Sequence, residues 1–157
     1  KLSNPAELVK KCVSVMTDIK QLEKERDSLQ SEISNLKTKS LFDNATEVKG
    51  VRVVTAMLTN MRPDVLRKMG DNIKAKESDV VAVIAGVNGD KANMLVVAGK
   101  DAVAKGVHSG KIVGKVAALT GGKGGGRPDS AMAGVGDRFK IDEALDKAVE
   151  IVSEFIK

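Results

Sequence analysis

A seven-residue repeat of apolar side chains runs through the first forty residues of the chain. One series places Leu or Val at every seventh position, and a second series follows it four residues later. The two series together form a seam whose members are Leu8, Cys12, Val15, Ile19, Leu22, Leu29, Ile33 and Leu36. Positions a and d of a heptad lie on one stripe of a helix, so the repeat predicts a coiled-coil-type helix over residues 1–40. Pro5 suits its first turn, where the missing N–H costs nothing.

An apolar stripe of two positions in seven needs a second helix to cover it. Three partners satisfy the pattern: a helix upstream in the same protein, a second copy in a homodimer, or the globular part of the chain. The sequence does not choose among them. Cys12 is the only cysteine, and on this seam it is expected to act as a small buried hydrophobe. A single cysteine allows no internal disulfide, which fits a reducing compartment and predicts a cytoplasmic protein.

Residues 41–50 are expected to be a polar connector, after which the pattern changes. Residues 51–157 are expected to form one globular domain of α+β or mixed α/β class, with a sheet of at least three strands packed by helices. The expected strands are 51–58, 80–87 and 92–98, and the expected helices begin at Pro63 and span 101–105, 109–120 and 140–156. Asn88-Gly89 predicts a hairpin between the second and third strands. Ser109 is expected to cap the 109–120 helix at its start and Gly121 at its end.

The run Gly121-Gly122-Lys123-Gly124-Gly125-Gly126-Arg127-Pro128-Asp129 is the strongest candidate for a functional site. Without a Cβ, consecutive peptide groups can lie flat against a ligand and offer N–H donors to phosphate or sugar oxygens. Lys123 and Arg127 add a positive charge at either end, and Pro128 restricts Arg127 to extended backbone. The run does not match the spacing of a Walker loop. It is therefore predicted to be a contact loop inside the domain.

Charge around this loop favours a polyanion as the partner. The chain has a formal net charge of +5, and residues 105–130 hold five basic residues against one acidic residue. The chain has three Phe, no Trp and no Tyr, so it lacks the aromatic platforms on which single-strand binders stack bases. A folded RNA such as tRNA, recognised by shape and backbone, is the expected partner. The candidate RNA contacts are Gly121, Gly122, Lys123, Gly124, Gly125, Gly126 and Arg127, together with Lys111, Lys115 and His108.

The sequence offers no candidate catalytic residue and no candidate metal-ligand set. His108 is the only histidine, and its neighbour Ser109 is better placed as a helix cap than as a nucleophile. Carboxylates are scattered over the helices and form no cluster with His or Cys. No apolar stretch is long enough to cross a bilayer, so no membrane contact is expected. The fragment is predicted to bind and position a partner, with no cofactor of its own.

The glycine run and its flanks also resemble a known family. Leu119-Thr120 before the run, Arg127-Pro128-Asp129 at its end and Ala131-Met132-Ala133-Gly134 after it are similar to the C-terminal domain of bacterial-type alanyl-tRNA synthetases. That domain belongs to the group that also accompanies DHH-family phosphoesterases, where histidine typically follows the glycines. This sequence departs from the synthetase pattern at Met132, where glutamine is common, and at Val135, where a second glycine is common.

The resemblance implies that the chain, which begins at Lys1, is part of an alanine–tRNA ligase. It implies that ATP, Mg and Zn belong to domains upstream of this fragment. The family's C-terminal domain touches the corner of the alanine-accepting tRNA, helps to bring it to the aminoacylation and editing sites, and in some members dimerises the enzyme. Two alternatives stay open: the substrate-binding domain of a DHH-type phosphoesterase acting on oligonucleotides, and a coiled-coil assembly module.

Overall fold

The computed structural model describes residues 5–43 and 45–157, and these divide between two compact units, Lys1–Leu36 and Lys37–Lys157. Each unit is described by itself. The first consists of the long helix α1 (Pro5–Phe42), whose last residues belong to the second unit. The helix predicted from the heptads is therefore present. Its pairing in a coiled coil stays a prediction, because the seam side chains are exposed, as Leu22 (64%) and Leu36 (63%) illustrate. Cys12 is exposed as well.

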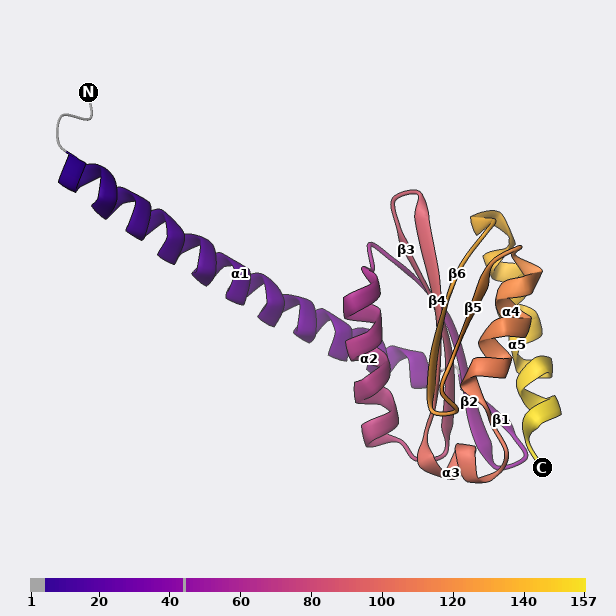
Figure 1. Ribbon diagram of the computed structural model, residues 1–157. Coiled ribbons are helices and arrows are strands. Elements are labelled where there is room, and N and C mark those ends of the chain that lie inside the picture. Colours follow the sequence, from indigo (N-terminus) through magenta and orange to yellow (C-terminus); the bar gives the residue numbers. More distant parts are fainter. Residues whose placement is uncertain (1–4, 44) are drawn as a thin grey trace. The chain divides into compact units, whose positions relative to one another are not determined.

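The second unit is built on a mixed six-stranded sheet in the order β1-β2-β3-β4-β6-β5 (Figure 1). Its strands are β1 (Thr46–Val48), β2 (Val51–Thr59), β3 (Val80–Asn88), β4 (Lys91–Ala98), β5 (Lys123–Gly126) and β6 (Ser130–Gly134). β2 and β3 are parallel and every other neighbouring pair is antiparallel. The three expected strands are confirmed, as is the hairpin at Asn88-Gly89, where Asn88 pairs with Lys91. A parallel pair needs a crossover, and α2 (Pro63–Lys76) supplies it between β2 and β3.

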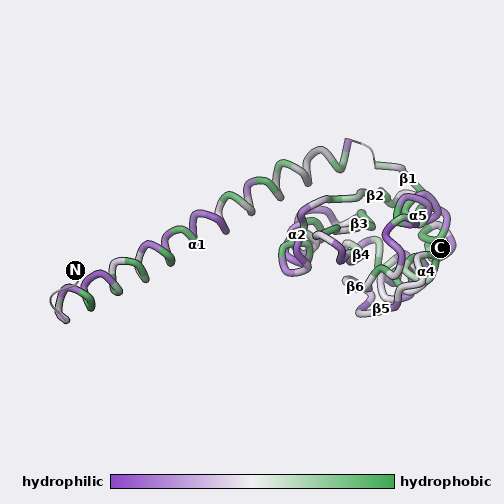
Figure 2. Tube along the Cα trace, turned by 90° about the horizontal axis from the view of Figure 1, so that it is seen from above, coloured by the Kyte–Doolittle hydropathy of each residue, from purple (hydrophilic) through white to green (hydrophobic). Residues whose placement is uncertain are grey.

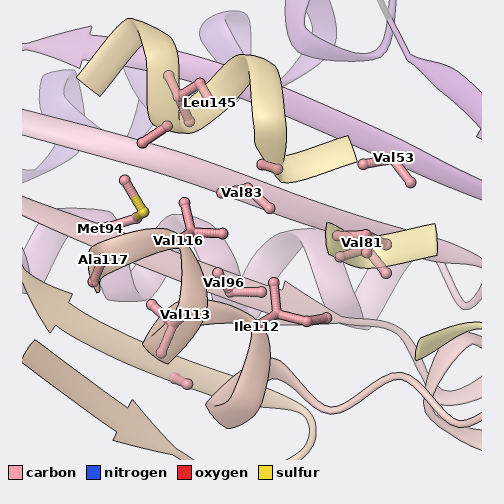
Figure 3. Close-up of a cluster of buried hydrophobic side chains, with 14 of the residues drawn as sticks. Val53, Val81, Val83, Met94, Val96, Ile112, Val113, Val116, Ala117 and Leu145 are labelled. Atoms are coloured by element: carbon pink, nitrogen blue, oxygen red, sulfur yellow. The ribbon is translucent and has the colours of Figure 1, made fainter. Parts of the chain in front are cut away.

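Helices cover both faces of the sheet (Figures 1 and 2). The helices that follow α2 are α3 (Lys100–Ala104), α4 (Ser109–Leu119) and α5 (Ile141–Phe155), with the short 3-10 turn η1 (Arg138–Lys140) before the last. On one face α2 buries Leu66, Met69 and Ile73 against β3 and β4. On the other face α4 and α5 pack against the sheet and against each other. Figure 3 shows side chains of α4 and α5 facing those of the strands.

The near-continuous apolar runs of β3 and β4 follow from this double covering. Val81 and Val83 face the α4–α5 core, whereas Ala82 and Ile84 face the α2 core, and all four are fully buried. Alternate residues of a strand point to opposite faces of the sheet. In a strand that helices cover on both faces, the side chains of both faces are therefore buried and apolar. The mixed α/β class predicted for this part of the chain is confirmed.

Three details of the sequence prediction were wrong. The connector 41–50 contains β1, which pairs with β2. The glycine run forms the edge strand β5 instead of a loop. The N-cap of α4 is His108, whose Nδ1 accepts a hydrogen bond from the Lys111 N–H, while Ser109 is the first helical residue and is buried. The predicted cap at the other end is confirmed, since Gly121 follows the helix with a positive φ of +71°.

In the described residues, no helix combines the length and the apolar character needed to cross a membrane.

Candidate nucleic-acid interface

The glycine run and the segment after it form a β-hairpin at the edge of the sheet. Gly126 of β5 stands opposite Ala131 of β6. Three backbone hydrogen bonds fix the turn between them: Arg127 N–H to the Ser130 carbonyl (3.0 Å), Ser109 N–H to the Pro128 carbonyl (2.9 Å), and Ala98 N–H to the Asp129 carbonyl (3.0 Å). Each residue of the turn is thus bonded to a different element, so its backbone is held before any ligand arrives.

One face of this hairpin is packed against α4. Gly124 and Gly126 alternate along β5 and Gly122 directly precedes it, and a Cβ added to any of the three would overlap the backbone of β6 or of the residues just after it. On the helix side, a Cβ on Gly110 would overlap the Gly126 carbonyl. These glycines let strand and helix approach closely. We call this the closed face of the hairpin.

The opposite face carries the residues between those glycines. Side chains alternate across a strand, so Lys123, Gly125 and Arg127 share the face that looks toward the α2 side of the sheet. A Cβ on Gly125 would meet nothing within 4 Å, and all three residues are exposed. Met132, opposite Gly125 on β6, is only partly buried against the α2 core. We call this the open face of the hairpin.

A cavity of about 470 Å³ lies between the open face and α2. Its walls include Gly125, Gly126 and Arg127 from the hairpin, Met132 from β6, and Arg67 from α2. A second cavity of about 760 Å³ adjoins it, and Lys74 and Asp129 line both. The ion pair between these two residues therefore stands where the cavities meet.

Lys74 is fixed by two carboxylates. Its Nζ lies 2.8 Å from Asp129 Oδ2 and 3.1 Å from Asp71 Oδ1. The hydrogen bond that Lys74 donates to Asp129, helped by the one that it donates to Asp71, raises the pKa of Lys74 above its ordinary value. The bond to Asp129 also lowers the pKa of that carboxyl group. Both groups are therefore charged at neutral pH. The pair ties α2 to the hairpin turn and adds a fourth anchor to it.

The structure brings together only part of the predicted RNA-contact set. Gly121 to Gly126, Lys123 and Arg127 belong to the hairpin and its entry, whereas His108, Lys111 and Lys115 belong to α4, on the other face of the sheet. Lys111 is exposed. Lys115 Nζ lies 2.5 Å from Glu154 Oε2 and 5.1 Å from the centre of the Phe155 ring, so it has intramolecular partners. RNA contact by these three residues stays a prediction.

No group of three or more His, Cys, Asp or Glu side chains that could hold a metal ion occurs within residues 5–43 and 45–157. His108 is engaged as the cap of α4. The arrangement present is one that can bind an anion through guanidinium, ammonium and exposed backbone groups.

Comparison with known proteins gives a consistent picture. The model of the DHHA1 domain family matches residues 50–157. Alanine–tRNA ligase of Clostridioides difficile is 41% identical over 150 residues, which is 96% of this chain and 17% of the relative. Alanine–tRNA ligase of Bacillus mycoides is 39% identical over 155 residues, which is 99% of this chain and 17% of the relative. The chain thus spans about a sixth of the length of these relatives.

Among solved structures, the C-Ala domain of Aquifex aeolicus alanyl-tRNA synthetase superimposes with a TM-score of 0.64 at 27% identity, covering 70% of this chain and 98% of that one. A DHH-domain protein described as a member of the s1p family of ribosomal proteins matches with a TM-score of 0.56 at 15% identity, covering 88% of this chain and 34% of that one. This second likeness concerns the fold alone.

Proposed function

The chain belongs to the DHHA1 domain family, and from this membership and its likeness to the C-Ala domain we propose that it is the non-catalytic tRNA-binding part of an alanine–tRNA ligase. In this proposal it binds the corner of the alanine-accepting tRNA and helps to position that tRNA for aminoacylation and editing. ATP, Mg and Zn act in parts of the ligase outside this chain. The observation that carries the proposal is the preformed hairpin whose open face presents Lys123 and Arg127 to solvent.

Electrostatics support an RNA partner. In the described part of the chain, neither Lys123 nor Arg127 forms an ion pair, whereas the neighbouring Asp129 is paired with Lys74. Two exposed cations that form no ion pair, placed on a strand and a turn held by hydrogen bonds, can each displace a counterion from a phosphate backbone. Because backbone contacts position an RNA without reading its sequence, recognition would depend on the folded shape of the tRNA.

A titration with tRNA tests the proposal. Intact tRNA should bind more tightly than an acceptor-stem hairpin that lacks the corner. Lys123→Ala should weaken binding and lower the slope of log K against log salt by about one unit, as expected when one phosphate contact is lost. Lys68→Ala, which removes an exposed charge of α2 that does not line the cavity beside the hairpin, should leave the slope unchanged. Equal affinity for both RNAs, or an unchanged slope in Lys123→Ala, would refute the assignment.

The phosphoesterase alternative is less well supported. The ligase relatives are about 40% identical over nearly the whole chain, while the DHH-domain structure shares 15% and indicates the fold only. The upstream sequence of the parent protein decides the matter, since a DHH-type phosphoesterase would carry an Asp-His-His motif and acidic metal ligands there.

The seam of α1 supports a second function, in assembly. Leu22 and its heptad neighbours are exposed along the helix, and such a stripe is stable in water only when another helix covers it. A mass measurement across a concentration range tests this function. A dimer that dissociates in Leu22→Asp identifies a second copy as the partner. A monomer at every concentration assigns the seam to another part of the parent protein.

A further inference from the structure

The cavity between α2 and the open face of the hairpin has the chemistry of a nucleotide site. We propose that it accepts one nucleotide of the bound RNA, with the phosphate held by Arg67 and Arg127 and the base lying over Met132. The inference rests on the proposed RNA-binding function and deepens it, because it places a single nucleotide in a defined cavity and gives Arg67 a role.

The charges of the cavity leave two guanidinium groups available. Arg67, Lys74 and Arg127 contribute three positive charges, and Asp71 and Asp129 contribute two negative ones. Both carboxylates are within ion-pair distance of Lys74. Arg67 and Arg127 form no ion pair in the described residues, and both residues are exposed. The charge of Arg127 acts on Asp129 only as a minor contribution to its lowered pKa, and Lys74 makes the hydrogen bond to that carboxylate. One guanidinium group lines each side of the cavity, Arg67 from α2 and Arg127 from the hairpin. A guanidinium group binds phosphate oxygens through two parallel hydrogen bonds, so both groups suit a phosphate ligand.

The surface opposite those charges suits a base. Leu95, Met132 and Gly125 form a row across three adjacent strands on the α2 face of the sheet. Leu95 is buried beneath, Met132 is partly exposed, and Gly125 has no side chain to occupy the space. The polarisable thioether of methionine makes favourable contacts with an aromatic ring. This row offers a base an apolar surface in a chain that has no Trp or Tyr.

The size and rigidity of the cavity fit one nucleotide. Its volume of about 470 Å³ falls in the range of ~300–1,000 Å³ that is typical of small-ligand sites. The turn that carries Arg127 is held by three backbone hydrogen bonds and by the Lys74–Asp129 pair. Little ordering entropy is therefore lost at the protein when the phosphate arrives. Lys76 and Lys100 line the adjoining cavity. The next phosphate along the RNA would lie there, beside these two positive charges.

Two substitutions test the proposal on the 157-residue chain. Arg67→Ala removes a phosphate contact, and Gly125→Val fills the cavity, since a Cβ at Gly125 meets nothing within 4 Å and its backbone is not left-handed.

The probes are the mononucleotides GMP and CMP, whose binding is monitored by amide NMR spectra, and intact tRNA. Either mononucleotide should shift the amide signals of Gly125, Gly126 and Ser130, with inorganic phosphate binding more weakly. Arg67→Ala should weaken mononucleotide and tRNA binding about tenfold, and Gly125→Val should abolish the mononucleotide shifts.

Matched controls separate the cavity from its surroundings. Lys68→Ala removes a charge from the adjacent position of α2, which does not line the cavity. Gly134→Val adds the same side chain at another exposed β6–β5 position with free space, also outside the lining. Both controls should bind mononucleotide as the unmodified chain does. Amide spectra of each free variant confirm that it is folded.

The outcomes distinguish this proposal from the proposed function. If tRNA binds through Lys123 but neither Arg67→Ala nor Gly125→Val affects binding, the nucleotide site is wrong and the tRNA function stands. If tRNA does not bind but mononucleotides shift the cavity signals and both substitutions abolish the effect, the tRNA function is wrong and the site stands. If inorganic phosphate binds as tightly as the mononucleotides, the cavity is an anion site and the assignment of a base to Met132 is overturned.

Discussion

The two faces of the β5–β6 hairpin are built from the same glycine-rich strand but serve different ends. On the closed face, Gly124 and Gly126 bring the strand against β6 and α4 at distances that no side chain would allow. On the open face, Gly125 has free space above it and stands between two exposed cations, Lys123 and Arg127. Glycines at alternate positions of one strand therefore play two different roles. Gly124 and Gly126 allow close packing, whereas Gly125 leaves space open to a ligand.

Two methionines on adjacent strands, one on each face of the sheet, give the comparison with the largest expected effect. Met94 of β4 faces the α4–α5 core and is fully buried, while Met132 of β6 lies on the open face. Met94→Ala should lower the free energy of unfolding by about 3 kcal/mol because it leaves a cavity in a packed core. Met132→Ala should lower it by only about 1 kcal/mol. Urea denaturation measures both, and equal losses would mean that the open face is covered in solution.

The glycines themselves give the second test. Gly124→Val should destabilise the domain by about 2 kcal/mol, because the added side chain must displace the backbone of β6. Gly125→Val should change stability by no more than about 0.5 kcal/mol, since it adds a β-branched residue to a strand where nothing is displaced. Thermal unfolding of the two variants compares them directly. A tolerated Gly124→Val would show that the close approach of strand to strand is not required.

The sequence predicted the parts of the fold whose side chains carry a pattern. The apolar runs of β2, β3 and β4, the heptads of α1 and the apolar face of α5 were all recognised from their periodicity, and the Asn88-Gly89 turn from its backbone chemistry. These signals lie in the residues themselves. They do not depend on which distant segment packs against them.

The strand β5 could not be predicted in this way. Glycine is depleted in strands because it loses the most backbone entropy and has no side chain to pack, so the run 121–126 indicated a loop. It forms a strand because Gly110 of α4 and Ala131 and Ala133 of β6 leave room only for bare backbone. That contact joins segments that no local pattern connects. Without the strand, no pattern in the sequence places Lys123 and Arg127 on one face of the sheet. Their separation from Lys111 and Lys115, which lie on α4 at the other face, is then missed as well.

The cavity was missed for a related reason. Arg67 lies on α2, and its sequence neighbourhood reads as an ordinary amphipathic helix with Leu66 and Met69 in the core. Only the sheet order, which places β6 and β5 beyond β4, brings this helix face beside the hairpin turn. The pairing of Lys74 with Asp129 across 55 positions of sequence is likewise a product of topology.

The Lys74–Asp129 pair, which anchors the turn on the open side, gives a smaller test through pH. The hydrogen bond from Lys74 lowers the pKa of Asp129, so the folded state binds this proton less readily than the unfolded state does. Its stabilisation is present above the ordinary carboxylate pKa of about 4 and is lost as the pH falls through the lower folded value. The raised pKa of Lys74 gives a contribution that is lost only at strongly alkaline pH, as the pH rises through the folded value.

Because Asp129 is 47% exposed, the pair should contribute at most about 1 kcal/mol. Asp129→Asn should therefore remove up to that amount at neutral pH and flatten the acid limb of the stability curve. Thermal unfolding between pH 3 and pH 7, compared with the unmodified chain, measures the change. An acid limb of the same steepness in the variant would assign the pH dependence to other carboxylates, of which Asp79, whose pKa is lowered by Arg52, is the first candidate.

Lys115 on α4 gives the smallest expected effect and bears most directly on where the RNA lies. Its Nζ is already held by Glu154 and lies over the Phe155 ring, both on α5. An exposed pair of this kind contributes little to stability, so Lys115→Ala should lower the free energy of unfolding by less than about 0.5 kcal/mol. If only the open face meets the RNA, the same variant should bind tRNA within about twofold of the unmodified chain and keep its salt slope. A loss as large as that of Lys123→Ala would mean that the RNA breaks the Lys115–Glu154 pair and wraps around the sheet edge. The difference between the two faces would then describe the free protein and not the complex.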